Sequence, residues 1–315
     1  MDVARKHEKY DALIRASQAL APMRTVIVHP CDETSLMGAV TAAAAGIIQP
    51  ILVGPESRIR TLGARLHMDL APFALIDTAH SHAAAAKSVE IVRMGQAEAL
   101  MKGSLHTDEL MSEVVSKDTG LRTARRISHV FIMDVPTYEK PLFITDAAVN
   151  IFPTLEDKAD IVQNAIDLAR ALGIDRPKVA ILSAVETVTS KIPSTIDAAS
   201  LCKMADRGQI VGGVLDGPLA FDNAISLKAA AVKHIDSPVA GHADILVVPD
   251  MEAGNLLAKE LTFLANADAA GIVLGARVPI ILTSRADDVR TRMASCAIAA
   301  LYAHARRESA QFVKV

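Results

Sequence analysis

The residues best suited to chemistry in this chain stand close together near its end. Residues 283–288 (TSRADD) place hydroxyl groups, a guanidinium and two carboxylates directly after the apolar run 278–282. Beyond Asp288 the apolar residues recur at three- and four-residue spacing, which predicts a helix. The polar cluster therefore lies at the carboxyl end of a predicted strand and at the amino end of a predicted helix.

This cluster has two interpretations. As a helix cap, Ser284 or Asp287 would accept backbone N–H bonds in the first turn, and acidic residues there complement the helix dipole. Capping does not require Arg285, whose cation would lie at the positive end of that dipole. If an anion also binds, the first-turn N–H groups and the guanidinium converge on the same phosphate or carboxylate. The cluster by itself leaves both interpretations open.

The elements that must position the cluster are alternating strands and helices. Eleven short apolar runs are separated mainly by segments of helical period, which indicates buried, mainly parallel sheets covered by helices on both faces. The predicted fold class is therefore α/β. The runs are residues 25–28, 50–53, 73–76, 98–101, 129–133, 142–145, 178–182, 212–215, 244–248, 271–274 and 279–282.

Eleven strands are many for one open sheet, so we predict two α/β/α domains with mainly parallel sheets. The connections 134–141 and 275–278 are too short to contain a helix, and we expect the chain to pass from one domain to the other and back at these places. Domain I is predicted to comprise residues 1–135 and 278–315, and domain II residues 136–277.

The composition excludes several classes of protein. With 315 residues, 51% of them hydrophobic, the chain can fill large globular cores. A net charge of −3, 3% aromatic residues and no Trp argue against nucleic acid or an anionic membrane as partner. Cys31, Cys202 and Cys296 form no C-x-x-C pair, and the chain shows neither a signal peptide nor a spanning helix. We therefore expect a soluble cytoplasmic protein with reduced thiols.

Common motifs are missing. The chain contains no G-x-G-x-x-G after a strand, no G-x-x-x-x-G-K-[ST], no H-E-x-x-H and no G-x-S-x-G. NAD, ATP, zinc protease and α/β-hydrolase chemistry are thus without support. His80 and His82 are interpreted as loop residues, not metal ligands, and Cys31–Asp32 as a small buried residue followed by a helix cap, not as a nucleophile.

Small, acidic and amide residues follow the predicted strands. In open α/β sheets, ligands bind beyond the carboxyl ends of the strands, so these loops form a rim suited to a polar ligand. In the loop KGSLHT, Gly103 has two interpretations: its backbone N–H belongs to a phosphate cradle, or it supplies a positive φ between strand and helix.

Six motifs occur in order along the chain. They are EALMKGSLHTDEL (98–110), SHVFIMDVP (128–136), TDAAVNIFPTLEDKADIVQNAI (145–166), DGPLAFDNAIS (216–226), ADILVVPDMEAGN (243–255) and PIILTSRAD (279–287). Together they resemble the phosphate acetyltransferase/phosphate butyryltransferase family, from about Thr25 to the final helix.

The resemblance implies a fold, a reaction and an assembly. The fold would be isocitrate/isopropylmalate dehydrogenase-like, with an active cleft between two α/β/α domains, and the protein would form homodimers. The reaction would be reversible acyl transfer between coenzyme A and inorganic phosphate, without a covalent enzyme intermediate or a bound cofactor. The expected partners are these small-molecule substrates, with coenzyme A as substrate, and neither nucleic acid nor a membrane.

The resemblance also implies roles for residues. Ser284 and Arg285 would donate to the developing charges, Asp287 or Asp288 would be the base, and Arg122 would hold a phosphate of CoA or of the acyl phosphate. Without the resemblance, Arg122 reads as a solvated helix residue. The remaining candidates for binding substrate and CoA are Lys102, Gly103, Asp146, Asn150, Asp216 and Asn255.

The chain departs from the acetyltransferase pattern in two respects. Only Ala286 separates the Ser-Arg pair from the two aspartates, and a basic segment before EALMKG is absent. Both features resemble the butyryltransferase branch. We expect a phosphate acetyltransferase, with phosphate butyryltransferase or another short-chain acyltransferase as the alternative. A metal- and NAD-dependent dehydrogenase of the same superfold and a silent CoA-binding subunit are the rival interpretations.

Overall fold

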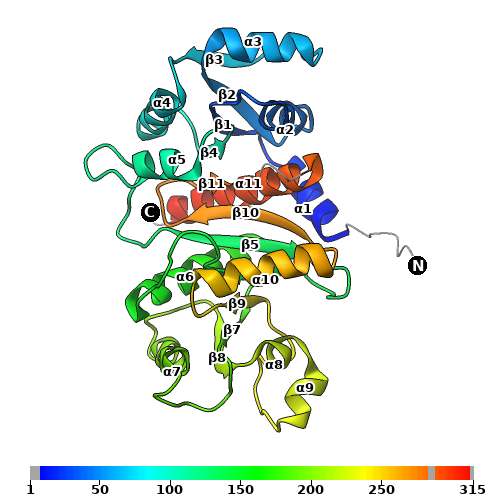
Figure 1. The fold of residues 1–315 in the computed structure, drawn as a ribbon, viewed down its shortest axis with the longest axis vertical. Coiled ribbons are helices and arrows are strands. Elements are labelled where there is room, and N and C mark those ends of the chain that lie inside the picture. The colour runs from blue at the N-terminus through cyan, green and yellow to red at the C-terminus, as the bar shows by residue number, and fades with distance from the viewer. Residues whose placement is uncertain (1–7, 283–287, 313–315) are drawn as a thin grey trace. The chain divides into compact units, whose positions relative to one another are not determined.

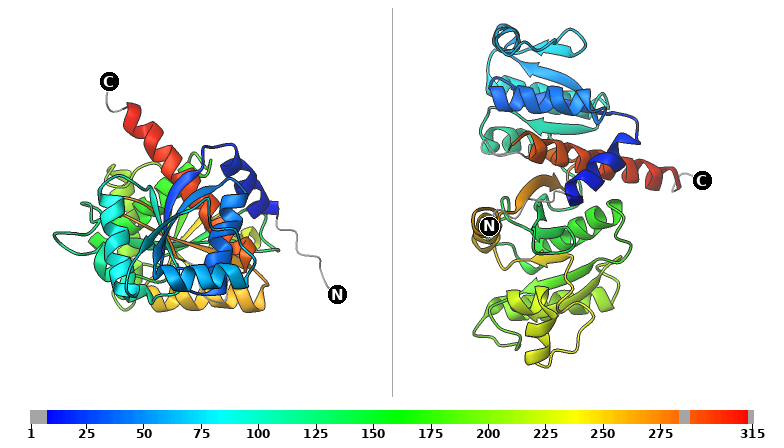
Figure 2. Two further views of the ribbon diagram at one scale, coloured as in Figure 1. Left: turned by 90° about the horizontal axis from the view of Figure 1, so that it is seen from above. Right: turned by 90° about the vertical axis from the view of Figure 1, so that its right-hand side faces the viewer.

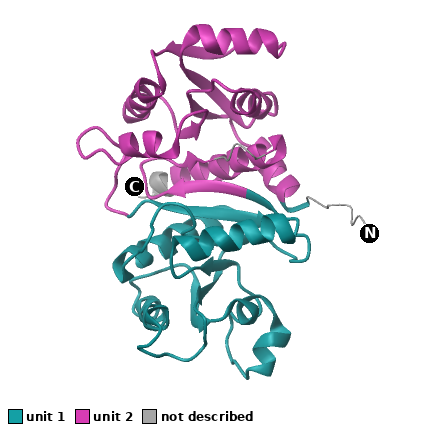
Figure 3. Cartoon of the chain, viewed as in Figure 1, with its two compact units in different colours: residues 1–9, 126–269 teal, residues 10–125, 270–315 magenta. Residues whose placement is uncertain are grey.

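The computed structural model describes residues 8–282 and 288–312, which form two compact units. Unit 1 comprises Met1–Lys9 and Arg126–Ala269, and unit 2 comprises Tyr10–Arg125 and Ala270–Val315 (Figure 3). All the predicted strands are present, and the prediction of an α/β fold with mainly parallel strands is confirmed.

Unit 2 contains a sheet with the strand order β3-β2-β1-β4-β11-β10. All neighbours in it are parallel except β10, which runs antiparallel to β11. The strands are β1 (Met23–Val28), β2 (Ile48–Gly54), β3 (Ala74–Asp77), β4 (Ala99–Lys102), β10 (Asp268–Leu274) and β11 (Ile280–Ile281).

Helices cover both faces of the unit 2 sheet (Figure 1). The C-terminal helix packs beside α2 on one face, as Figures 1 and 2 show in red and blue, while α4 and α5 pack together on the other. The helices are α1 (Glu8–Gln18), α2 (Glu33–Ala44), α3 (Glu56–Arg65), α4 (Ser81–Arg93), α5 (Thr107–Val114) and α11 (Val289–Phe312).

Unit 1 contains strands in the order β5-β6-β9-β7-β8, of which only β5 is antiparallel to its neighbour. Helices α6 and α7 lie on one face and α8, α9 and α10 on the other (Figure 1). The elements are β5 (Ser128–Asp134), β6 (Leu142–Thr145), β7 (Lys178–Leu182), β8 (Val214–Leu219), β9 (Ile245–Val247), α6 (Leu155–Ala171), α7 (Pro193–Asp206), α8 (Phe221–Ile225), α9 (Leu227–Val232) and α10 (Met251–Leu264).

The division into units differs from the predicted domain limits. The chain changes unit at 125/126 and 269/270, about one strand before the connections in which we placed the crossings. The reason is pairing: β5 bonds to β6 and β10 bonds to β11, so each antiparallel pair stays largely within one unit. That the units are separate domains stays a prediction.

Local sequence explains why these elements form. Strands β4 and β6 are buried along their whole length, as expected for central strands of a covered sheet. Several helices begin at a side-chain cap: Asp32 accepts the N–H of Ser35 at the start of α2, and Asp250 accepts that of Ala253 at the start of α10.

The strand register brings carboxyl ends together. In unit 2, Val28 at the end of β1 is opposite both Val53 and Lys102, and Ile281 of β11 is opposite Met101. The carboxyl ends of β2, β1, β4 and β11 therefore lie at one edge of the sheet. None of the helices in the described part of the chain is long and apolar enough to span a membrane.

Candidate functional site

The predicted site residues divide between the two units. Lys102, Gly103, Arg122 and Asp288 belong to unit 2, whereas Asp146, Asn150, Asp216 and Asn255 belong to unit 1. Ser284, Arg285 and Asp287 lie outside the described residues.

Asp288 caps helix α11. Its Oδ1 accepts the backbone N–H of Thr291 at 2.7 Å, and its carbonyl accepts the N–H of Arg292 at 3.2 Å. The capping interpretation named Ser284 or Asp287, which lie outside the described residues; among the described residues, Asp288 caps the helix. The carboxylate is exposed, so one of the two candidate bases is held at the helix start.

Lys102 and Gly103 end β4 beside β1. Lys102 is only 8% exposed, and its Nζ lies 3.4 Å from the carbonyl of Gly103. The N–H of Gly103 donates to the carbonyl of Val28 at 2.9 Å. The φ of Gly103 is not positive, so the second interpretation of this glycine is wrong. The residue is glycine because a Cβ would lie 2.4 Å from the oxygen of Val28.

A serine that the sequence analysis missed joins the loops after β4 and β1. Ser104 Oγ donates to the carbonyl of His29 at 2.9 Å, accepts the N–H of Cys31 at 3.1 Å, and lies 3.1 Å from His29 Nδ1. The Ser104 N–H also donates to the His29 carbonyl at 2.9 Å. These bonds join the two loops at the carboxyl edge of the unit 2 sheet. In the sequence, the only indication of a role for Ser104 was its position directly after a predicted strand.

The thiol of Cys31 is not an activated nucleophile. Burial raises its pKa, although the charge of Arg58 opposes this. Burial also lowers the pKa of His29, and Arg58 lowers it further. At neutral pH this edge therefore presents an uncharged thiol and an uncharged imidazole, and Asp32 is the helix cap, as predicted.

Arg292 was also missed. Its side chain is 3% exposed on α11 and packs closely on Gly38 of α2, where a Cβ would lie 2.9 Å from Arg292 Cδ. Burial by itself raises the pKa of Asp32, but hydrogen bonds from Ser35 and Thr34 and the charge of Arg292 hold it below its ordinary value. The sequence could have indicated a buried role for Arg292, because this cation lies four residues before Cys296, on the apolar face of the predicted helix.

Arg122 is not a helix residue. Its backbone bridges to Ala276 in antiparallel fashion, and its side chain is exposed. Thr123 strengthens this attachment, since its hydroxyl donates to the carbonyl of Gly275 at 2.6 Å. The segment is therefore fixed at its backbone while the guanidinium of Arg122 faces solvent.

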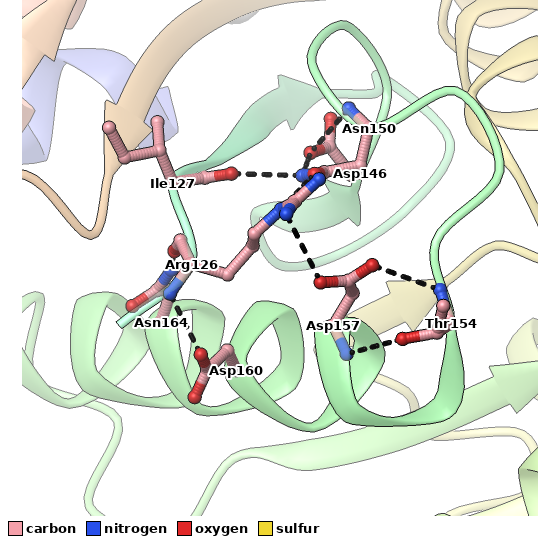
Figure 4. A network of polar contacts seen from close by, with 8 residues as sticks. All are labelled: Arg126, Ile127, Asp146, Asn150, Thr154, Asp157, Asp160 and Asn164. Atoms are coloured by element: carbon pink, nitrogen blue, oxygen red, sulfur yellow. Dashed lines mark hydrogen bonds and ion pairs between the residues drawn. The ribbon is translucent and has the colours of Figure 1, made fainter. Parts of the chain in front are cut away.

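In unit 1, Asp146 and Asn150 shape the loop after β6 (Figure 4). Asp146 Oδ1 accepts the N–H groups of Ala148 and Val149, and Oδ2 accepts the Asn150 side-chain amide at 2.5 Å. Asn150 also donates to the carbonyl of Ile127 at 2.9 Å. Both side chains are almost fully buried. Their bonds hold the loop, and contact with a substrate stays a prediction.

The loop network continues to Arg126, as Figure 4 shows. Arg126 Nε donates to Asn150 Oδ1 at 2.7 Å, and Nη1 lies 3.4 Å from Asp157 Oδ1. Its backbone N–H donates to Asp160 at 2.8 Å. The guanidinium is thereby held in place although the side chain is 53% exposed.

His129 on β5 is buried close to Asp146. Burial lowers the pKa of His129 to about 4, even though the charge of Asp146 raises it. Among the described residues its Nδ1 has no hydrogen-bond partner, and its ring meets Phe131 edge-on with centroids 4.3 Å apart. The imidazole is therefore neutral at physiological pH.

Asn255 lies with the Asp146 loop, whereas Asp216 does not. Asn255 Nδ2 lies 3.3 Å from the carbonyl of Ala147. Asp216 is on β8, which the order β6-β9-β7-β8 separates from β6 by two strands. Burial, followed by the charge of Asp216, raises the pKa of Cys202 to about 12.

Histidines and acidic residues form no metal site in the described part of the chain, where no group of three or more His, Cys, Asp or Glu could hold an ion. His80 caps α4, with Nδ1 accepting the N–H of Ala83 at 3.2 Å, and His82 contacts Glu109 at 3.3 Å.

Comparison with known proteins decides the family. The sequence profile of the phosphate acetyl/butaryl transferase family matches residues 79–300. The chain belongs to this family. Within the family, a phosphate acetyltransferase of Rhizobium meliloti is 69% identical over 307 residues, which cover 98% of this chain and 97% of the relative. A phosphate butyryltransferase of Clostridium acetobutylicum is 43% identical over 94% of this chain and 98% of the relative.

Solved structures agree with this membership. A branched-chain phosphotransacylase from Enterococcus faecalis V583 superposes with a TM-score of 0.76 at 30% identity, over 90% of this chain and 99% of that one. A 4-hydroxythreonine-4-phosphate dehydrogenase from Klebsiella pneumoniae, at 12% identity, shares the fold with a TM-score of 0.53 over 90% and 99% of the two chains. The expected dehydrogenase-like fold of this transferase family is thus confirmed.

Proposed function

We propose that the protein is a phosphate acetyltransferase, which converts acetyl-CoA and inorganic phosphate to acetyl phosphate and CoA, reversibly. The observation that carries this function is 69% identity, over nearly the full length of both chains, to the Rhizobium meliloti phosphate acetyltransferase. The geometry of unit 2 supports it, because the segment with the Ser-Arg pair follows β11, the parallel neighbour of β4, which ends at the buried Lys102.

The chemical step requires a thiolate. A free thiol with a pKa of about 8.5 is only a few per cent ionised at neutral pH, so attack on acetyl phosphate gains from a positioned base. In our proposal Asp287 or Asp288 takes the thiol proton. The sulfur then bonds to the carbonyl carbon, the bond from that carbon to the phosphate oxygen breaks, and inorganic phosphate leaves.

Charge develops on the carbonyl oxygen and on the departing phosphate during this step. Ser284 and Arg285 are proposed to donate to these oxygens, as preorganised donors act in other acyl transfers. Lys102 and Arg122 would attract the phosphate groups. Gly103, Asp146, Asn150, Asp216 and Asn255 remain the proposed contacts of substrate and CoA.

The acyl group is proposed to be acetyl. In the spacing of its Ser-Arg-Ala-Asp segment the chain resembles butyryltransferases, but its identity to the Clostridium acetobutylicum phosphate butyryltransferase is 43%, against 69% for the acetyltransferase. Overall identity is counted over nearly the whole chain, whereas motif spacing reflects one segment. Acetyl is therefore favoured, and butyryl is the alternative.

The deciding experiment measures thioester formation from CoA with acetyl phosphate and, separately, butyryl phosphate, in excess chelator and without nicotinamide. We expect turnover with acetyl phosphate and a lower kcat/KM with butyryl phosphate. A higher kcat/KM with butyryl phosphate would establish the alternative. Folded protein that binds CoA without any turnover would overturn the enzymatic proposal in favour of a silent subunit. Dependence on metal and nicotinamide would establish a dehydrogenase.

The oligomeric state and the cellular location of the protein are also part of the proposed function. We propose a cytoplasmic homodimer that takes CoA as a substrate, needs no bound cofactor and produces acetyl phosphate. Light scattering of the purified protein should give twice the 33.4 kDa mass of the chain. A mass of one chain at assay concentration would contradict the dimer without affecting the reaction.

A further inference from the structure

A cavity in unit 2 lies outside the predicted catalytic segment. It has a volume of about 310 Å³ and lies between the loop after β1 and one side of helix α3. Its lining consists of Cys31, Ser57, Arg58, Thr61, Leu62 and Arg65, and we refer to it as the α3 pocket. A space of this size is comparable to small-ligand sites in other proteins.

The α3 pocket carries positive charge that the described residues leave largely unpaired. In the described residues, Arg58 has neither an ion pair nor a side-chain hydrogen bond. Arg65 Nη2 is 4.0 Å from Glu33 Oε2, but both side chains are more than half exposed, so that pair contributes little. The hydroxyls of Ser57 and Thr61 add two further donors.

The groups that face these arginines are neutral or already bonded. Cys31 stays a thiol because burial raises its pKa, and His29 stays neutral because burial lowers its pKa. The carboxylate of Asp32 is occupied as the cap of α2, where it accepts from Ser35 and Thr34. An anion that enters the pocket therefore meets Arg58, which has no ion pair among the described residues, and the weakly paired Arg65. Charge-assisted bonds of this kind are strong.

The strand order limits which anion this is. The pocket follows β1 and β2, whereas the predicted catalytic segment follows β11, and the order β2-β1-β4-β11 separates β2 from β11 by three strand spacings, about 14 Å. The acyl phosphate must bring its carbonyl carbon within about 3.5 Å of the CoA thiol to react. An anion held in the α3 pocket is therefore too far from the predicted catalytic segment to be the phosphate that leaves in this step.

CoA carries such a group. Its thiol and its adenosine 3′-phosphate are at opposite ends of a long molecule, and the 3′-phosphate is a phosphomonoester with up to two negative charges. We propose that the α3 pocket binds the 3′-phosphate of CoA, with Arg58 as the principal donor and Arg65 as the second. This inference rests on the proposed function, because that function makes CoA the substrate.

The test compares two variants and two substrates. Arg58→Gln removes the unpaired cation, and Arg60→Gln is the matched control, because Arg60 is exposed on the same helix and bonds to Glu56 outside the pocket. Dephospho-CoA lacks only the 3′-phosphate. We expect Arg58→Gln to raise the KM for CoA about tenfold or more, since a hydrogen bond to a charged group is lost, with kcat unchanged.

The pattern across substrates identifies the phosphate. In the wild type, dephospho-CoA should have a KM raised about as much, and Arg58→Gln should then add no further increase. An equal increase with both substrates would place the diphosphate there instead and overturn the proposal. So would an unchanged KM for CoA, or an increase confined to the KM for inorganic phosphate. Arg60→Gln should have the wild-type KM for CoA. An equal rise of the KM in Arg60→Gln would mean that the net charge of helix α3, not the pocket, affects CoA binding, and would overturn the proposal.

A binding measurement separates this inference from the proposed function. By calorimetry, adenosine 3′,5′-bisphosphate should bind the wild-type protein at least tenfold more tightly than adenosine 5′-monophosphate, and Arg58→Gln should remove that preference. This holds whether or not the protein turns over acetyl phosphate. Turnover of acetyl phosphate without a preference for the bisphosphate would overturn only the role proposed for the α3 pocket. A preference for the bisphosphate without turnover would overturn only the proposed enzymatic function.

Discussion

Asp288 fixes the start of helix α11 through Thr291, whose backbone N–H donates to Asp288 Oδ1 at 2.7 Å. Helix α11 packs along α2 and carries the buried Arg292 in its first turns. A single carboxylate thus sets one end of the segment that we expect to be catalytic.

The cap can be tested by stability. We expect Asp288→Ala to lower the free energy of unfolding by about 1 kcal/mol, because the first-turn N–H loses its acceptor. Asp288→Asn should keep most of that stability, since an amide oxygen also accepts. Urea unfolding measures both, and equal losses in the two variants would contradict a capping role.

The two aspartates should differ in catalysis. Because Asp288 is engaged with the helix, we expect Asp287 to be the base, so that Asp287→Asn loses about 10²-fold or more in kcat. Asp288→Asn should lose much less. The measurement is the initial rate of thioester formation at saturating CoA. The reverse order of the two variants would assign the base to Asp288.

Arg285 should act on the chemical step. Arg285→Ala is expected to lower kcat about 10²-fold or more, because a charged donor to the developing negative charge is lost. Arg60→Ala, which removes an exposed cation from α3, is the control and should keep full activity. An active, folded Arg285→Ala variant would refute the role assigned to this residue.

Gly103 should not tolerate a side chain. A Cβ there would lie 2.4 Å from Val28 O and 2.6 Å from His29 O, both backbone atoms that cannot move independently of β1. We expect Gly103→Ala to cost about 3 kcal/mol or more in unfolding free energy. Gly46→Ala is the comparison: its Cβ meets nothing within 4 Å, so only its φ of +74° is unfavourable, which costs about 1–2 kcal/mol. Equal losses would contradict the close approach of β4 and β1.

His129 should make stability depend on pH. Its pKa is about 4 in the folded protein, against an ordinary value of 6.5 that we take for the unfolded chain. Between these values the unfolded chain binds the proton and the folded protein does not. The free energy of unfolding therefore does not change through this group above pH 6.5. It decreases as the pH falls from 6.5 towards 4, by up to about 1.4 kcal/mol per pH unit.

The matching variant is His129→Leu, which fills the site without a titrating group. Its free energy of unfolding should fall less steeply than that of the wild type between pH 6.5 and 4. Parallel curves for the wild type and His129→Leu would show that His129 is protonated in the folded protein as well.

The strands could be predicted because their signal is local. Runs such as VFIM in β5 and LFIT in β6 are continuously apolar or nearly so, as strands covered on both faces must be. The short link between these two strands was interpreted as a crossing between domains, whereas the chain changes compact unit about one strand earlier. The length of a connection shows that two strands are close in sequence, but only the hydrogen bonds between the strands show that they belong to the same compact unit.

The candidate site was predicted unevenly. Asp32 was expected as a cap because Asp before a helical period is a local signal, and it caps α2. Arg122 was read as a helix residue without the family resemblance, because its bridge to Ala276 joins positions far apart in the chain. For the same reason His29, Ser104 and Arg292 went unnoticed: each matters through partners on other elements.

The sequence by itself determined the α/β class, the strands, the start of the last helix and, through its ordered motifs, the family. These depend on the period of apolar residues and on residue types at fixed spacing, which a linear chain displays. Tertiary structure alone decided the order β3-β2-β1-β4-β11-β10, the bonding of Ser104 to His29, and the place of Arg58 beside a cavity, without an ion pair among the described residues. Each of these depends on which distant segments pack together, because packing decides which polar groups meet a partner.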